Sequence, residues 1–192
     1  IGHEMELFMF NDAAGPGLPF WMPKGAKLRY KLESILHKAH LTRGYEPVRG
    51  PEILKADMWR TSGHYACYGE NMYLTTIDEQ EYGIKPMNCL GHIQVFKQTP
   101  KSYRDLPLRY YEYGLVHRHE KSGVLHGLLR VREFTQDDAH IFCEPNQIAA
   151  EVLDVVEFVD SVMKLFGFEY TMEVATKPEK AIGEDSVWEM AT

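Results

Sequence analysis

The sequence predicts an α+β domain built on an antiparallel sheet. Helix and strand patterns follow one another irregularly, which argues against a doubly wound parallel sheet. Two long strand patterns, at residues 108–120 and 132–142, are joined by a loop short enough for an antiparallel pair. The chain has 192 residues, of which 44% are hydrophobic, so it can bury a core as one large domain or two small ones.

The predicted helices carry apolar residues at the spacing of one helical face. The first covers residues 25–43 and stops at Gly44, and the strongest covers residues 146–166 and stops at Gly167. Shorter helices are expected at residues 56–61, at residues 91–97 and from Asp185, where the pattern still runs at Thr192. Shorter strands are expected at residues 45–48, 72–75, 82–85 and 168–175. A chain that stops inside a helix suggests a piece of a longer protein.

The second long strand carries the least usual side chains. Alternation with period two places five residues on one face: Arg132, Phe134, Gln136, Asp138 and His140. Burying such a row is costly unless a ligand binds it, which favours the floor of a binding site. A plain solvent face is the alternative. The opposite face is not cleanly apolar either, since it carries Glu133, Thr135, Asp137, Ala139 and Ile141. On the first strand the same alternation places Arg118 and Glu120 together.

The net charge of −7 is unevenly distributed. Residues 1–100 are neutral overall, residues 101–132 carry +4, and residues 133–192 carry −11. The overall acidity argues against non-specific nucleic-acid binding. The basic segment leads into the loop between the long strands, where it could bind the phosphate of a small ligand or one end of an RNA. A solvated turn with scattered charges is the alternative.

Cysteine usage and hydropathy bear on the cellular location. Three cysteines, Cys67, Cys89 and Cys143, are too few for a disulfide framework and indicate a reducing compartment. No apolar run reaches the length of a membrane span, and the first residues do not form a signal peptide. We therefore expect a cytoplasmic protein with no membrane partner.

Several single residues are candidates for chemistry, each with an ordinary alternative. Cys89 and His140 are possible soft-metal ligands, although lone residues of these types usually lie in a core. Arg118 and Glu120 could form a structural ion pair, or could be an arginine for phosphate with an orienting carboxylate. His64 could be a general base or a surface histidine.

Two segments of the strand pair resemble motif 2 of the class II aminoacyl-tRNA synthetases, in the detail of the threonine-specific members. They are residues 116–120 (VHRHE) and 132–140 (REFTQDDAH). Further segments agree: residues 61–64 (TSGH), 85–89 (KPMNC), 102–109 (SYRDLPLR) and 122–128 (SGVLHGL). Residues 25–54 look like motif 1. The resemblance covers almost the whole chain, and its motifs are long and ordered.

The resemblance implies an antiparallel sheet flanked by helices and a homodimer formed through motif 1. It implies an enzyme that uses ATP with Mg²⁺ to convert L-threonine to threonyl-adenylate and then transfers threonine to tRNA(Thr). A prolyl or seryl enzyme of the same class is disfavoured, because these commonly lack the pair Cys89 and His140. A non-catalytic synthetase-like protein that binds RNA or a partner is also disfavoured, because it does not need the full set of candidate site residues.

The resemblance also assigns roles to residues that bind substrates. Arg118 is expected to bind the α-phosphate of ATP and to stabilise charge during the reaction, while Arg130 lies near ATP or the tRNA end. Glu120 is expected to read the adenine amino group, and Phe134 to stack on the ring. Met87, Gln136 and Asp138 are expected to bind threonine, with Asp138 near its hydroxyl. His64 is expected to assist the transfer to the tRNA ribose.

A zinc ion is implied as well, with Cys89 and His140 as two of its three protein ligands. A hydrophobic pocket separates threonine from the isosteric valine by only about a hundredfold, whereas a site that the hydroxyl completes can do much better. The third ligand is expected beyond residue 192, together with motif 3 and the editing and anticodon-binding domains. Leu90 and Glu133 depart from the usual pattern. We therefore expect the first part of a catalytic domain, impaired when isolated.

Overall fold

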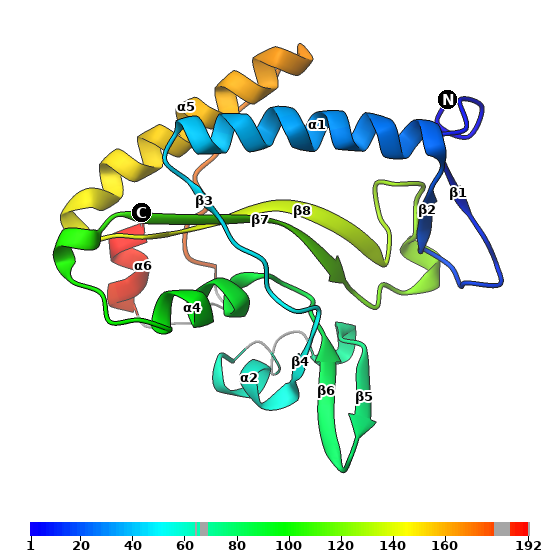
Figure 1. The fold of residues 1–192 in the computed structure, drawn as a ribbon, viewed down its shortest axis with the longest axis horizontal. Coiled ribbons are helices and arrows are strands. Elements are labelled where there is room, and N and C mark those ends of the chain that lie inside the picture. The colour runs from blue at the N-terminus through cyan, green and yellow to red at the C-terminus, as the bar shows by residue number, and fades with distance from the viewer. Residues whose placement is uncertain (64, 66–68, 179–184, 192) are drawn as a thin grey trace. The chain divides into compact units, whose positions relative to one another are not determined.

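The computed structural model describes residues 1–63, 65, 69–178 and 185–191, and it divides the chain into two compact units. The first unit is Ile1–Pro145 and the second is Asn146–Thr192. Figure 1 shows the elements of both units in chain order. Each unit is described separately below.

The first unit is organised around an antiparallel pair of long strands, β7 (Leu108–His117) and β8 (Glu133–Phe142). The short strand β3 (Glu46–Pro47) runs parallel to the outer side of β7 and completes a three-stranded sheet. The residues of β7 and β8 pair in an unbroken register from Leu108 with Phe142 to His117 with Glu133. The predicted α+β class and antiparallel pair are confirmed.

Both long strands are shorter than predicted at the loop end. The amide of Arg118 still bonds the carbonyl of Arg132 at 2.9 Å, but the amide of His119 donates to Asn71 instead, at 2.8 Å. The chain therefore turns away from the strand pair after His117. Arg118 and Glu120 lie beyond the strand, so the prediction that they share a strand face is wrong.

Helix α1 (Pro23–Thr42) covers one face of the strand pair. Pro23 suits the first turn, where a missing N–H has no cost. Gly25 lets the helix approach the preceding chain, because a Cβ atom there would lie 1.9 Å from the carbonyl oxygen of Leu7. On the sheet side, the hydroxyl of Tyr113 donates to the carbonyl of Glu33 at 2.9 Å.

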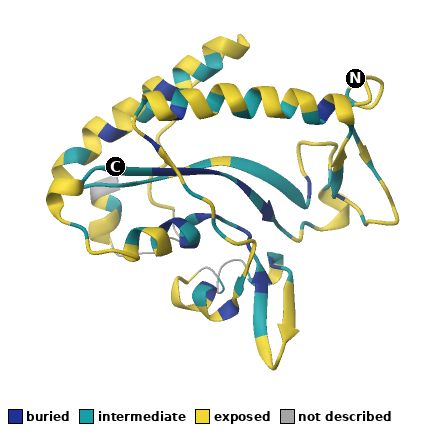
Figure 2. Ribbon diagram, viewed as in Figure 1, coloured by how far each residue is buried: buried dark blue, intermediate teal, exposed yellow. Residues whose placement is uncertain are grey.

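Helix α4 (Cys89–Lys97) and the segment before it meet the other face of the pair. Phe96 of α4 stacks on Phe142 of β8, with 4.1 Å between ring centroids and 5° between ring planes. Figure 2 shows that buried residues gather on β7, between the two covered faces. The row of mostly polar side chains that the sequence placed on one side of β8 therefore does not simply face solvent.

A second sheet leads into this segment, in the order β4 (Ile53–Lys55), β6 (Gln80–Ile84) and β5 (Leu74–Ile77). Helix α2 (Ala56–Thr61) packs beside it and matches the predicted bounds. A small apolar core joins Trp59, Met72 and Leu90. A two-stranded hairpin, β1 (Phe8–Phe10) with β2 (Pro19–Trp21), was not predicted, because three residues are too few to show a period. Single 3-10 turns occur at Gly69–Asn71, Tyr103–Asp105, Ser122–Val124 and Pro145–Gln147.

The second unit contains α5 (Ile148–Phe166) and α6 (Asp185–Ala191). Gly167 ends α5 with a φ of 68°, a left-handed conformation that favours glycine, as predicted. The strand predicted at residues 168–175 is wrong, because a strand needs a partner and no described strand pairs with this exposed segment. Among the described residues, no helix is long and apolar enough to cross a membrane.

Candidate functional site

Seven polar side chains meet where the segment before α4 and α4 itself cover the strand pair. We call this group the polar face, and it consists of Lys85, Asn88, His92, Glu112, Gln136, Asp138 and His140. Four of them are buried, with exposed fractions of 4% for Lys85, 1% for Asn88, 0% for His92 and 4% for Glu112. Buried polar groups of this density must satisfy one another or a ligand.

Asn88 connects the covering segment to β8. Its Nδ2 donates to Oδ2 of Asp138 at 2.9 Å and lies 3.5 Å from Oε1 of Gln136. Asn88 can come this close because the residue beneath it on β7 is Gly114, where a Cβ atom would lie 2.1 Å from Oδ1 of Asn88. Two of the three predicted threonine-binding side chains, Gln136 and Asp138, thus contact one buried amide.

Glu112 lies at the centre of the polar face. Its Oε1 is 3.4 Å from Nζ of Lys85 and 3.4 Å from Nε2 of His92, and its Oε2 accepts from the amide of Gly50 at 3.2 Å. Burial alone would raise the pKa of this carboxyl, but the contacts with His92, Gly50 and Lys85 together hold the pKa below its ordinary value. Glu112 is therefore an anion at neutral pH.

His140 contacts the polar face through His92. The two Nδ1 atoms lie 2.9 Å apart, and the rings are nearly perpendicular, at 87°. Burial lowers the pKa of His140 and the nearby carboxylate of Asp138 opposes this shift, leaving the pKa below its ordinary value. His140 is therefore a neutral imidazole, the form in which histidine binds metal ions.

Cys89 begins α4 and is half-buried. Burial and the negative charge of Asp138 raise the pKa of the thiol, while Arg118 partly opposes them. The charge of Asp138 thus acts to raise the pKa of both Cys89 and His140. Their sulfur and nitrogen atoms are donors that suit zinc. Within the described ranges, however, no group of three His, Cys, Asp or Glu side chains is arranged to hold a metal ion.

The residues predicted to bind ATP lie at the loop end of the strand pair. The Arg118 guanidinium lies 5.1 Å from the ring centroid of Phe134 and donates through Nε to the carbonyl of Pro86 at 3.1 Å. Nε of Arg130 lies 3.4 Å from Oε2 of Glu120, with 58% of the Arg130 side chain exposed. The structure thus brings Arg118 to Phe134 and Arg130 to Glu120.

Two predicted residues have not yet been located, and four residues of the polar face were not predicted. His64 lies outside the described residues, and Met87 is half-buried beside Asn88. Sequence reasoning did not single out Lys85, Asn88, His92 or Glu112. A signal existed for Glu112, since a lone carboxylate between tyrosines in a buried strand is unusual.

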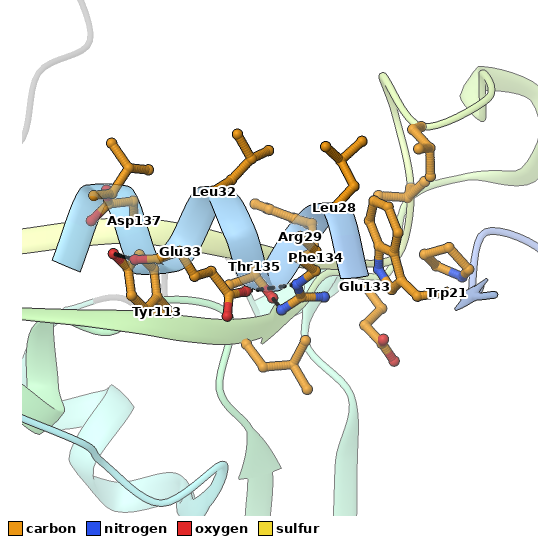
Figure 3. A pocket seen from close by; sticks show the side chains of 15 residues that line it. Trp21, Leu28, Arg29, Leu32, Glu33, Tyr113, Glu133, Phe134, Thr135 and Asp137 are labelled. Atoms are coloured by element: carbon orange, nitrogen blue, oxygen red, sulfur yellow. Dashed lines mark hydrogen bonds and ion pairs between the residues drawn. The ribbon is translucent and has the colours of Figure 1, made fainter. Parts of the chain in front are cut away.

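A cavity of about 380 Å³ lies on the opposite face of the strand pair, beneath α1. Its lining includes Trp21, Leu28, Arg29, Leu32, Glu33, Tyr113, Glu133, Thr135 and Asp137. Figure 3 shows Arg29 of α1 between the carboxylate of Glu33 and Thr135 of β8. Of the predicted site residues that the structure describes, only Phe134 lines this cavity, so the cavity and the polar face are different places.

Comparisons with known proteins agree with the motifs. Residues 73–191 match the family model described as the tRNA synthetase class II core domain (G, H, P, S and T). Over all 192 residues, the chain is 86% identical to a threonine--tRNA ligase of Sulfurovum sp. (strain NBC37-1) and 67% identical to one of Campylobacter lari (strain RM2100). The chain covers 32% of each of these proteins, so it spans about a third of their length.

A solved structure gives the same result for the fold. The chain aligns with a crystal structure described as the RNA binding domain of threonyl-tRNA synthetase from Cryptosporidium parvum Iowa II. The TM-score is 0.92 and the identity is 43%, over 99% of this chain and 48% of the other.

Proposed function

The chain belongs to the class II tRNA synthetase core family, and on that premise we propose that it is the first part of the catalytic domain of a threonine--tRNA ligase. The parent enzyme would form threonyl-adenylate from L-threonine and ATP with Mg²⁺ and transfer threonine to tRNA(Thr). The polar face carries this proposal, because buried polar side chains converge there on the two residues expected to bind threonine. Dimerisation through residues 25–54 and a cytoplasmic location belong to the same proposal.

Arg118 would serve the adenylation step. Its contacts with Pro86 and the ring of Phe134 hold the guanidinium at the loop end of the strand pair. There it would bind the α-phosphate of ATP and stabilise the charge that develops as the threonine carboxylate attacks. Phe134 would stack on adenine, Glu120 would accept from the adenine amino group, and Arg130 would contact ATP or the tRNA end.

Asp138 and Gln136 would bind threonine, with Met87 beside them. Asn88 fixes the Asp138 carboxylate from one side, so its remaining acceptor capacity can be directed at the threonine hydroxyl. Cys89 and His140 would hold zinc together with a donor from outside the described residues. When bound, that ion would supply a Lewis-acidic site for the amine and hydroxyl of threonine.

Amino-acid-dependent pyrophosphate exchange by the parent enzyme tests this function. We expect exchange with threonine, less with serine, which keeps the hydroxyl but lacks a methyl group, and little with valine or proline. Exchange with proline or serine instead would assign another specificity, and no exchange would favour a non-catalytic protein.

The change Arg118→Ala in the parent enzyme should lower the rate of adenylate formation by about a hundredfold or more. The matched change Arg60→Ala, in an exposed ion pair on α2, should leave the rate near wild type. A near wild-type rate for Arg118→Ala in single-turnover measurements would remove Arg118 from the adenylation step.

His64 is assigned by resemblance alone to the transfer step. We expect His64→Ala to slow transfer to tRNA more than adenylation, because its role would lie at the ribose. Equal losses in the two single-turnover steps would contradict this assignment.

A further inference from the structure

Two histidines meet within the polar face, and their contact requires a hydrogen on one of them. Nδ1 of His92 and Nδ1 of His140 are 2.9 Å apart. Two ring nitrogens at this distance repel unless one carries a hydrogen and donates it to the other. The contact is therefore a hydrogen bond in which either His140 or His92 is the donor.

The other nitrogen of His92 decides which ring donates. Nε2 of His92 is buried and has no hydrogen-bond partner within the described part of the chain, and the polar atom it faces is Oε1 of Glu112, 3.4 Å away. A lone pair aimed at a buried carboxylate would be repelled, so Nε2 must carry a hydrogen. If His92 is neutral, its Nδ1 has no hydrogen and must accept the one on His140.

Lys85 already supplies a buried counterion for Glu112. Its Nζ lies 3.4 Å from the same Oε1 of Glu112, and both side chains are at least 96% buried, with exposed fractions of 4% and 3%. Glu112 therefore already has a buried counterion. A charged His92, whose side chain is 0% exposed, would be a second desolvated cation beside a single carboxylate, which is costly.

We propose that His92 is a positioning residue, which accepts the Nδ1 hydrogen of His140 and so leaves the lone pair of His140 on Nε2. Lys85 and Glu112 hold His92 in this state from the buried side. Nε2 is the ring nitrogen of His140 that does not contact His92, so its lone pair would be the one offered to an electrophile. This is the arrangement by which a buried partner orients a metal-binding histidine.

The position of His92 on α4 adds to this inference. Cys89 and His92 are three residues apart on the same helix, so they lie on one side of it. Helix α4 would therefore supply one metal donor itself and orient the other, which lies on β8. Only the naming of zinc as the electrophile rests on the proposed function.

The ring tautomers test the proposal without any metal. NMR spectra of the metal-free parent enzyme labelled in its histidine rings distinguish a hydrogen on Nδ1 from one on Nε2. The signals of His92 and His140 are assigned by their loss in His92→Asn and in His140→Asn. We expect the hydrogen on Nδ1 of His140 and on Nε2 of His92. A hydrogen on Nε2 of His140 in the neutral ring would overturn the proposal.

Two matched variants test the effect on metal binding. His92→Asn places an amide near the position of Nδ1 and can still accept from His140, whereas His92→Gln places its amide near Nε2, toward Glu112. Zinc affinity, measured by competition with a chelator, should stay close to wild type in His92→Asn and fall by about 10–100-fold in His92→Gln. His3→Asn, an exposed histidine, serves as the control and should bind zinc as wild type does.

The outcomes separate this proposal from the proposed function. Equal zinc affinity in wild type, His92→Asn and His92→Gln would overturn the role of His92 while leaving the zinc site in place. If the wild-type parent enzyme binds no zinc, the proposed metal site fails, and the ring spectra alone then support or overturn the hydrogen bond.

Discussion

The two faces of the β7–β8 pair are both covered, but they differ in what the covering helix buries. Beneath α1 the face remains partly open, with a cavity of about 380 Å³ and an Asp137 side chain that is 30% exposed. Beneath α4 the corresponding groups are enclosed, and the side chains of Glu112 and His92 are 3% and 0% exposed. The buried polar groups, rather than the cavity, therefore mark the face that carries the candidate site.

Each covering helix also contributes a histidine, and the two histidines carry their hydrogens differently. On α1, Nδ1 of His40 donates to the carbonyl of Leu36 at 2.8 Å, while Nε2 lies 3.3 Å from Oδ1 of Asp137. That second contact needs another hydrogen, either on Nε2 or on the carboxyl. On α4, His92 needs only one, because His140 supplies the hydrogen of their shared bond. The histidine on α1 thus contacts a carboxyl group of β8, whereas the histidine on α4 contacts another histidine of β8.

The largest expected effect comes from filling the space that Gly114 leaves for the Asn88 side chain. Gly114→Ala places a Cβ atom 2.1 Å from Oδ1 of Asn88, so the amide must leave Asp138 and Gln136. We expect the free energy of unfolding to fall by about 1–3 kcal/mol, as in other overpacked cores. Urea unfolding measures this loss, and threonine activation by the parent enzyme should fall with it.

Gly123→Ala is the matched control for this change. No heavy atom lies within 4 Å of a Cβ built at Gly123, so its stability should stay within about 0.5 kcal/mol of wild type. Equal stabilities of the two variants would mean that the face beneath α4 accommodates the added methyl group without losing the Asn88 contacts.

A smaller effect is expected on the open face. Nη2 of Arg29 donates to Oγ1 of Thr135 at 2.6 Å, and Thr135→Val removes that acceptor without changing the shape of the side chain. The expected loss is about 1 kcal/mol of unfolding free energy, the typical net contribution of one hydrogen bond. Thr76→Val, on the exposed strand β5, should change stability by less than about 0.5 kcal/mol. Identical results for both threonines would show that the contact of α1 with β8 is not stabilising.

The smallest effect concerns the acid side of the stability profile, where the two faces should respond with opposite sign. The folded pKa of Glu112 lies below its ordinary value of 4.5, so its contribution is present above pH 4.5 and is lost as the pH falls through the folded pKa. Burial raises the pKa of Asp137 above 3.8, so the folded state takes up this proton first and gains relative stability as the pH falls.

Unfolding at a series of pH values tests this sign difference. Between about pH 7 and pH 3.5, the loss of stability should be smaller than wild type in Glu112→Gln and larger than wild type in Asp137→Asn. A shift in the same direction for both variants would contradict the assignment of the two carboxyls to different environments.

The sequence predicted which strand residues share a face better than it predicted which residues pack against that face. Period-two alternation placed Gln136, Asp138 and His140 on one face correctly, because a strand pleat depends only on local geometry. It could not identify His92 or Glu112, because their burial depends on contacts between residues 20 or more apart, such as His92 with His140 at a separation of 48. The end of β7 was missed for the same reason, since it is set by the bond from His119 to Asn71.

The separations in sequence across the polar face also bear on how the chain folds. His117 and Glu133, at the mouth of the β7–β8 hairpin, are 16 residues apart, whereas Asn88 and Asp138 are 50 apart. Closing the longer loop costs more chain entropy, so we expect the hairpin to form first and the contacts of Asn88 with Asp138 and of His92 with His140 to form later. During that interval β8 would expose its carboxylate and imidazole to water. The polar composition of this strand would then keep the unfinished hairpin soluble, where an apolar strand would invite association with another chain.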